Sequence, residues 1–177
     1  MNAARFAATA ALMAWHAGAP AHAQELVFEI DRAHYELVVR DLQSGEQAPI
    51  LRVATGSPAR ATPKGEFSLH VVILNPAWTP GEDAEAAGAE RRQASLDGPM
   101  GAVKIPFADQ GSIALHGGGD PLLLGKPVSG GCVRASDAEL LRLVAWLDRR
   151  AALAPPLVRP DGEIHRAFRR PAVLRVR

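Results

Sequence analysis

Residues 113–134 read IALHGGGDPLLLGKPVSGGCVR, and this stretch says most about how the chain folds. Its apolar start predicts a strand that ends at His116 and enters a glycine-rich loop. Sixteen residues later comes Cys132, the only cysteine of the chain, with two glycines before it. Ser136 and Glu139 then form the Ser-x-x-Glu pattern of a capping box, which predicts the start of a helix. A histidine and a cysteine therefore flank one loop, between a strand and a helix.

Outside this stretch, one helix and several strands are predicted. The helix has one apolar face, formed by Leu140, Leu143, Val144 and Leu147. Basic residues suit its C-terminal end, and Pro155-Pro156 stops it. Short β-rich segments with turns between them predict strands over residues 26–30, 35–40, 50–55, 66–74, 102–107, 112–115 and 172–176. Because no alternating βαβ units are visible, we expect a mostly β fold, a closed or sandwich-like β-barrel with one amphipathic helix after Cys132.

The composition is that of a globular protein and excludes several classes of function. Of the 177 residues, 47% are hydrophobic and 22% are charged. Lys and Arg total 20 and Asp and Glu total 19, and a net charge of +1 gives no support to nucleic-acid binding. A single cysteine excludes an intrachain disulfide and a cysteine-rich zinc site, and His34, His70 and His165 show no metal-ligand spacing. A zinc site formed by His116, Cys132 and a third residue is the less favoured alternative. We therefore expect no metal and no cofactor.

The first 23 residues have the features of a signal peptide. An apolar run from Phe6 to Trp15 follows Arg5, and Ala21-His22-Ala23 is a small-x-small cleavage site. We therefore predict a signal peptide at 1–23, one mature domain at 24–177, and a location in the periplasm or cell envelope. No apolar run reaches the roughly 20 residues of a membrane span, so we expect no stable membrane span after cleavage.

The cysteine and the histidine together are the minimum equipment for thiol acyl transfer. A thiolate is the nucleophile, and an imidazole can take the thiol proton and later return it to a leaving amine. Gly130 and Gly131 would let backbone N–H groups approach the reacting carbonyl. Arg134 lies two residues past Cys132, on the same side of an extended strand, and its guanidinium suits a substrate carboxylate. The residues alone leave a second explanation open, an inert buried cysteine near a structural histidine.

From about Glu25 to about Leu153 the chain resembles the catalytic domain of the L,D-transpeptidase family, of the YkuD/ErfK type. The signature of that family is a histidine, then Ser-His-Gly-Cys, then Arg or Asn. This chain has His116, Ser129-Gly130-Gly131-Cys132 and Arg134, so Gly130 stands where the family has a second histidine. Further family-like pieces follow in the expected order: Ala54-Thr-Gly56, Thr62-Pro-Lys-Gly-Glu-Phe67, Asn75-Pro-Ala-Trp78 and Pro99-Met-Gly101.

The resemblance implies an enzyme of peptidoglycan biosynthesis and cell shape. Its substrate would be a stem peptide, cleaved between a diamino acid and D-alanine, with transfer of the acyl group to an amine acceptor. The resemblance also assigns roles: Cys132 as nucleophile, His116 as proton donor and acceptor, Gly117 as the carbonyl that orients His116, the backbone N–H groups of Gly131 and Cys132 as oxyanion hole, and Arg134 and Ser129 as substrate-binding residues.

Alternatives remain open at this stage. A related L,D-carboxypeptidase would use the same Cys–His pair and give the acyl group to water. A non-catalytic wall-binding module is the third possibility, in which the lost second histidine marks lost chemistry.

The roles of three parts of the chain are also open. Instead of binding substrate, Arg134 could form a structural ion pair with Asp137 or Glu139. Residues 79–98 predict either a solvated insertion or a flap over the site, and the arginine-rich C-terminal part either a solvated face or a surface for an anionic polymer.

Overall fold

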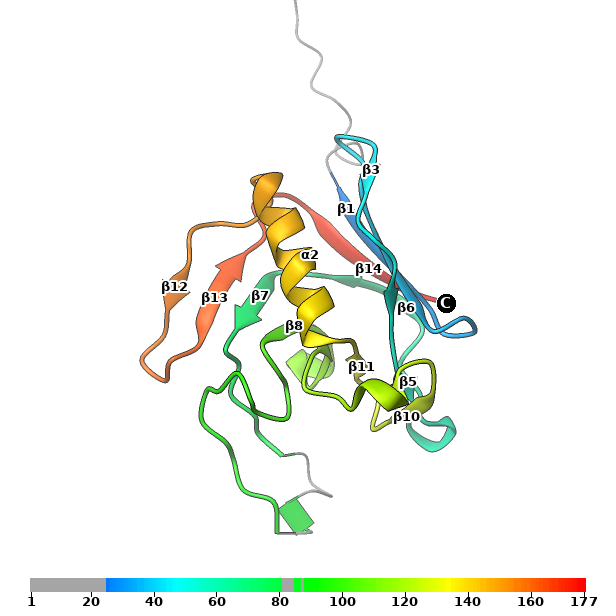
Figure 1. Cartoon of the computed structure of the whole chain (residues 1–177), viewed down its shortest axis with the longest axis vertical. Helices are drawn as coiled ribbons and strands as arrows, with labels where there is room; N and C mark the ends of the chain where they lie inside the picture. The colour runs from blue at the N-terminus through cyan, green and yellow to red at the C-terminus, as the bar shows by residue number, and fades with distance from the viewer. Residues whose placement is uncertain (1–24, 81–84, 87) are drawn as a thin grey trace, which may run out of the picture.

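The structure is a computed structural model that describes residues 25–80, 85–86 and 88–177 (Figure 1). The predicted signal peptide at 1–23 lies outside the described residues, as does the predicted first residue of the mature chain, Gln24. No helix in the described part is long and apolar enough to cross a membrane.

The first sheet contains six strands: β1 (Leu26–Asp31), β2 (Glu36–Asp41), β3 (Glu46–Gln47), β4 (Leu51–Arg52), β6 (Gly65–Ser68) and β14 (Ala172–Val176). The strand order is β3-β2-β1-β14-β6, and β4 also pairs with β2. The last strand, β14, runs parallel to β1 and antiparallel to β6. The C-terminal strand therefore lies inside the sheet, next to the first strand of the domain.

The second sheet also has six strands, in the order β11 (Val133–Arg134), β9 (Ile113–His116), β8 (Val103–Ala108), β7 (Val71–Leu74), β13 (Ile164–Ala167) and β12 (Leu157–Val158). A short parallel ladder joins β5 (Thr55–Gly56) to β10 (Pro127–Ser129). Three single 3₁₀ turns complete the connections: η2 (Pro58–Arg60), η3 (Asp109–Gly111) and η4 (Pro121–Leu123). Alternate residues of β8 are buried, so one face of this sheet belongs to the core.

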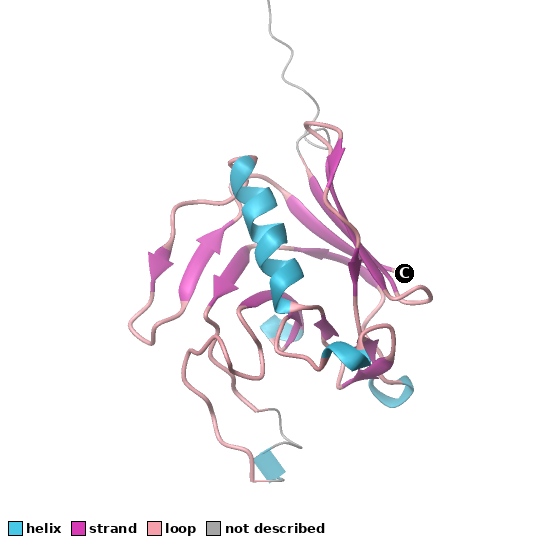
Figure 2. Ribbon diagram, in the orientation of Figure 1, coloured by secondary structure: helices cyan, strands magenta, loops and turns pink. Residues whose placement is uncertain are grey.

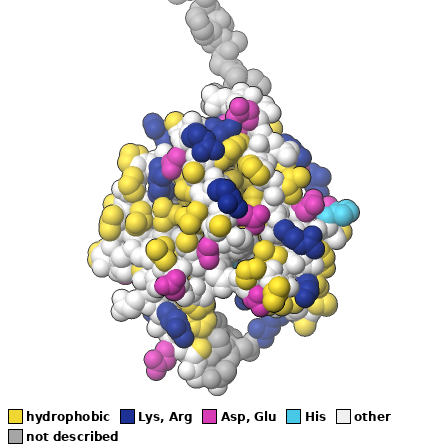
Figure 3. Space-filling view, viewed as in Figure 1, with side chains coloured by type: hydrophobic (Ala, Val, Ile, Leu, Met, Phe, Trp, Pro, Cys, Tyr) yellow, Lys and Arg dark blue, Asp and Glu magenta, His cyan; other side chains and the backbone are white. Residues whose placement is uncertain are grey.

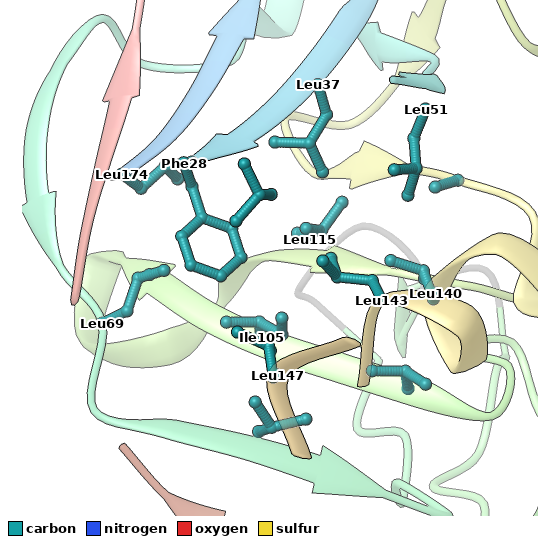
Figure 4. Close-up of a cluster of buried hydrophobic side chains, with 14 of the residues drawn as sticks. Phe28, Leu37, Leu51, Leu69, Ile105, Leu115, Leu140, Leu143, Leu147 and Leu174 are labelled. Carbon is teal, nitrogen blue, oxygen red and sulfur yellow. The ribbon is translucent and has the colours of Figure 1, made fainter. Parts of the chain in front are cut away.

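The helix α2 (Asp137–Arg149) lies against both sheets (Figures 1 and 2). Its predicted apolar face is buried, and Trp146 is buried with it. Figure 4 shows this face meeting side chains from both sheets, among them Phe28, Leu37, Ile105 and Leu115. Each fully buried side chain of this kind contributes about 1.5–3 kcal/mol to stability. The helix thus joins the two layers into one core.

The predicted fold class is confirmed: the protein is mostly β, with one amphipathic helix after Cys132 and two sheets that form a sandwich-like fold. Among the described residues, the strand pairings do not close either sheet into a barrel. Most of the strands predicted from alternating patterns are present within one or two residues of their predicted bounds.

Two segments predicted as single strands each form two. Residues 66–74 divide into β6 and β7, which belong to different sheets, because the chain crosses between the layers at Leu69-His70. The Leu69 N–H donates to the Ala172 carbonyl (2.8 Å), and the His70 carbonyl accepts from the Phe168 N–H (3.0 Å). The crossover from β6 to β7 therefore lies beside the crossover from β13 to β14. Residues 50–55 likewise divide into β4 and β5.

The helix begins where it was predicted, but not through the predicted cap. Ser136 occupies the N-cap position, yet its side chain makes no cap hydrogen bond, so the expected capping box does not form. The helix also ends at Arg149, several residues before Pro155-Pro156. Part of the following basic segment forms the hairpin of β12 and β13, which the sequence did not predict.

The surplus of arginine near the C-terminus is largely neutralised by ion pairs. Five pairs involve these arginines: Arg150–Glu46, Arg166–Asp148, Arg170–Asp41, Arg175–Glu66 and Arg177–Glu29. Figure 3 shows acidic and basic side chains interspersed over one face of the molecule. This distribution favours a solvated surface over a docking face for an anionic polymer.

Candidate active site

Two adjacent strands of the second sheet bring the predicted site residues together. In the parallel pairing of β9 with β11, His116 lies opposite Arg134 and Leu115 lies opposite Val133. Residues directly opposite each other in a sheet point to the same face. Cys132 precedes β11 and is two residues from Arg134, so period-two alternation places it on that same face.

His116 is buried, with 2% of its surface exposed, and its orientation is fixed by one hydrogen bond. Its Nδ1 lies 2.6 Å from the carbonyl oxygen of Gly117. Because a carbonyl oxygen can only accept, Nδ1 carries the proton and donates it. The lone pair of a neutral ring is then on Nε2, the nitrogen that can take a proton from a thiol.

The surroundings keep this imidazole uncharged at neutral pH. Burial lowers the pKa of His116 to about 4, although the hydrogen bond to Gly117 acts in the opposite direction. The positive charges of Arg134 and Lys104 contribute to this lowered pKa, and the negative charge of Asp137 opposes it. The Nε2 lone pair of this neutral ring can accept a proton, but the lowered pKa makes the imidazole a weaker base than a free histidine.

The Cys132 thiol is partly buried and is not bonded to His116 in this structure. Its Sγ donates to the carbonyl oxygen of Ser112 at 3.6 Å. Among the described residues, no hydrogen bond joins Cys132 to His116. Transfer of the thiol proton to the imidazole therefore requires the thiol to leave the Ser112 carbonyl. Such contacts are often long or misaligned before substrate is bound.

Ser129 is buried next to the turn at Gly130–Cys132, with only 3% of its surface exposed. Its Oγ donates to the Cys132 carbonyl (2.5 Å) and accepts from the Gly131 N–H (3.1 Å). The hydroxyl therefore holds the loop that carries the thiol. It also occupies the Gly131 N–H, one of the two donors expected for the oxyanion hole.

The side chain of Arg134 has unused hydrogen-bonding capacity. Its main chain is fixed by two hydrogen bonds with Ala54 (2.8 and 2.9 Å). In the part of the chain that the structure describes, it forms no ion pair with Asp137 or Glu139, and its buried Nε has no acceptor. Leaving a buried donor unsatisfied costs about 1–3 kcal/mol, so Arg134 Nε is available to a bound acceptor; Arg150 Nε is the other such atom among the described residues.

The structure adds Asp137 and Lys104 to the site, both of which sequence reasoning missed. The Asp137 carboxylate accepts hydrogen bonds from the N–H groups of Ala102 (2.6 Å) and Gly118 (3.1 Å). Lys104 lies directly opposite His116 on the other neighbouring strand, β8. The signal for Lys104 was its place between two buried apolar residues of a strand, which points it to the face of the histidine.

The position of the missing second histidine, Gly130, is exposed and open. A Cβ atom added there would have only the Arg60 guanidinium nearby, at 3.9 Å. Nothing in the fold therefore forbids a side chain at this position. Among the described residues, no three histidine, cysteine or acidic side chains are close enough together to hold a metal ion.

Comparison with known proteins gives the family. The sequence profile of the YkuD family, described as the L,D-transpeptidase catalytic domain, matches residues 25–158. The chain belongs to this family. Over 98 residues it is 34% identical to a Bacillus subtilis (strain 168) protein named "Putative L,D-transpeptidase YqjB", a match that covers 53% of this chain and 51% of that protein.

Solved L,D-transpeptidases have a similar fold. An L,D-transpeptidase from Mycobacterium tuberculosis H37Rv aligns with 85% of this chain and 57% of its own, at 13% identity and a TM-score of 0.51. L,D-transpeptidase 3 from Mycobacterium tuberculosis, in complex with a faropenem-derived adduct, aligns with 85% of this chain and 60% of its own, at 14% identity and a TM-score of 0.50. The chain thus spans about half the length of the Bacillus relative and less than two thirds of these solved chains.

Proposed function

We propose that this L,D-transpeptidase family member is an active enzyme that transfers an acyl group from a peptidoglycan stem peptide through Cys132. One observation carries the proposal: the chain's single cysteine lies at the strand next to a buried histidine whose Nε2 lone pair is free. The family acts on peptidoglycan peptides, which supports the choice of substrate.

The first half of the reaction forms a thioester. The Cys132 thiol gives its proton to Nε2 of His116, and the thiolate attacks the carbonyl carbon that links the diamino acid to D-alanine. His116 then returns the proton to the departing amine, the C–N bond breaks, and D-alanine leaves. In the second half an amine acceptor attacks the thioester carbonyl and gives a proton to His116, the C–S bond breaks, and His116 returns the proton to the Cys132 sulfur.

Backbone and side-chain donors around the cysteine would stabilise the charges that develop. The N–H groups of Cys132 and Gly131 are the proposed oxyanion donors, and the Gly131 N–H would have to turn from Ser129 toward the substrate. The unsatisfied Nε of Arg134 fits a role in binding a substrate carboxylate. Ser129, which is buried, would serve by holding the loop.

Two further parts of the proposal concern place and acceptor. The signal-peptide features of residues 1–23 support export to the periplasm or cell envelope, where peptidoglycan is found. An amine acceptor is proposed over water, but a carboxypeptidase would form the same thioester. A non-catalytic module is less favoured, because the chain keeps Cys132, His116 and Arg134 of the family signature.

Product analysis tests this function. Purified protein is incubated with disaccharide tetrapeptide muropeptides, and the products are separated and weighed by mass spectrometry. We expect released D-alanine and cross-linked dimers, and neither product with Cys132→Ala. D-alanine without dimers would identify the carboxypeptidase instead. No D-alanine from folded wild-type protein would reject both enzymes.

A further inference from the structure

The peptide group between Gly117 and Gly118 connects His116 to Asp137. Its carbonyl oxygen, on Gly117, accepts the Nδ1–H of His116 at 2.6 Å. Its N–H, on Gly118, donates to Oδ2 of Asp137 at 3.1 Å. One peptide group therefore has the imidazole at one end and a carboxylate at the other.

The geometry of a peptide couples these two contacts. The group is planar, and the peptide bonds of the described residues are not cis, so its C=O and N–H point in opposite directions. A carboxylate that fixes the N–H consequently fixes the direction of the C=O. Hydrogen bonds in series also polarise one another, so an anion on the N–H makes the carbonyl a better acceptor for the imidazole N–H.

The surrounding residues fit this arrangement closely. A Cβ atom at Gly117 would overlap Oδ1 of Asp137, so only glycine permits the approach. Gly118 has a φ of +68°, a conformation that side chains other than glycine rarely adopt. The second oxygen of Asp137 is held by the Ala102 N–H at 2.6 Å, so the carboxylate cannot turn away from the loop.

We propose that Asp137 is a positioning residue for His116 and acts through the Gly117–Gly118 peptide group. The carboxylate sets the carbonyl, the carbonyl sets the Nδ1–H tautomer, and the tautomer presents the Nε2 lone pair toward the cysteine side of the sheet. Asp137 thus does for His116 what a directly bonded acid does in a Ser-His-Asp triad, but across one peptide bond. The catalytic role of His116 rests on the proposed function. The orientation of His116 by Asp137 does not depend on it.

A pair of acid-to-amide variants in the same turn of α2 tests the proposal. Asp137→Asn keeps the size but removes the anion and leaves one acceptor oxygen for two N–H donors. With that oxygen on Ala102, the closer donor, the NH₂ group faces Gly118 and cannot accept from it. Glu139→Gln makes the same charge change at a residue that forms no hydrogen bond to the glycine loop in the described part of the structure. Imidazole ¹⁵N NMR then reports the tautomer of His116, amide exchange reports the Gly118 N–H, and muropeptide assays report kcat and KM.

In wild-type protein we expect neutral His116 to be the Nδ1–H tautomer and the Gly118 amide to be protected from exchange. Asp137→Asn should remove that protection and populate the Nε2–H tautomer. It should lower kcat roughly 10- to 100-fold, the loss seen when an outer partner of a metal-bound histidine is removed, with KM within about twofold. Glu139→Gln should change none of these.

Several results would overturn the proposal. An Nε2–H tautomer of His116 in wild-type protein would do so, and so would a Gly118 amide that is not protected from exchange. Both are measured without any variant. Another is Asp137→Asn with a lower melting temperature but an unchanged His116 spectrum and kcat, which would leave Asp137 a structural role only. If Asp137→Asn does not fold, Asp137→Ser replaces it with the same expectations. A wild-type protein without activity, in which Asp137→Asn still shifts the tautomer, would reject the proposed function and keep this inference.

Discussion

Gly130 and Gly131 stand next to each other before Cys132, yet their surroundings differ. Gly131 has a φ of +122°, and a Cβ there would come within 2.9 Å of Ile113 Cδ1. Gly130 has open space around it. We therefore expect Gly131→Ala to lower the free energy of unfolding by about 1–3 kcal/mol, the usual range for such backbone strain.

Gly130→Ala is the matched control for that change. It should alter stability by less than about 0.5 kcal/mol, as surface substitutions usually do. Urea unfolding of both variants measures the difference. Equal stabilities of the two variants would contradict the backbone conformation described for this loop.

The buried imidazole predicts a particular dependence of stability on pH. The pKa of His116 is lowered, mainly by burial, to about 4, whereas an unfolded histidine has a pKa of about 6.5. Between these values the unfolded chain binds a proton that the folded chain does not. Stability should therefore fall as the pH is lowered from about 6.5 to about 4, by on the order of 2–3 kcal/mol.

Chemical unfolding across this pH range, on wild type and on His116→Gln, isolates the contribution of the histidine. The difference in unfolding free energy between the two proteins should change across the window and be constant above it. A difference that does not vary with pH would mean that the imidazole is solvated or already charged in the folded protein.

At the scale of elements, a buried ion pair joins strand β2 to the chain just before β14. The carboxylate of Asp41, which is 2% exposed, accepts two hydrogen bonds of 2.6 Å from Arg170. Arg170 holds the pKa of Asp41 at about 2, although burial acts in the opposite direction. The ion pair thus links β2, an inner strand of the first sheet, to the crossover that precedes β14.

Asp41→Asn should lower the free energy of unfolding at pH 7 by about 2–4 kcal/mol, because it removes the buried negative charge that accepts two hydrogen bonds from the Arg170 guanidinium. The contribution of Asp41 is present above the unfolded pKa near 4 and is lost as the pH falls toward 2. Thermal unfolding against pH measures both, with Asp97→Asn as an exposed control. A variant as stable as wild type at pH 7 would show that the pair contributes nothing.

The elements that sequence predicted best are those whose pattern is local. The alternation in β1, β2 and β8 and the helical spacing in α2 depend only on which side chains face the core. The division of β6 from β7 depends instead on Phe168 and Ala172, about 100 residues away, and no local pattern carries that information. The hairpin of β12 and β13 was missed because its strands are short and mostly exposed or half-buried.

The same distinction applies to the candidate site. His116, Cys132 and Arg134 could be found because they form a motif with fixed spacing around one loop. Asp137 was considered only as a possible ion-pair partner of Arg134, because its contact with Ala102 spans 35 residues of sequence and no local pattern indicates it. The hydrogen bond from Cys132 to the Ser112 carbonyl depends on side-chain geometry, which spacing does not give.

At the scale of the whole molecule, the site lies where three parts meet: the end of the second sheet, the start of α2 and the glycine loop after β9. The helix is held by the core of both sheets, so its first residue, Asp137, has a fixed place relative to β9. The distant parts of the fold therefore determine the geometry of His116. Because the site depends on the whole fold, the proposed acyl transfer through Cys132 should be tested on the intact protein.

The most direct test weighs the protein itself during the reaction. Intact-protein mass spectrometry follows incubation with a stem tetrapeptide that ends in D-alanine, and peptide mapping locates any adduct. We predict a mass increase equal to the tetrapeptide without D-alanine, on Cys132, with one D-alanine released per adduct. Adduct formation should slow in His116→Ala and vanish in Cys132→Ala. A folded wild-type protein without this adduct, or with the acyl group on another residue, would contradict the account.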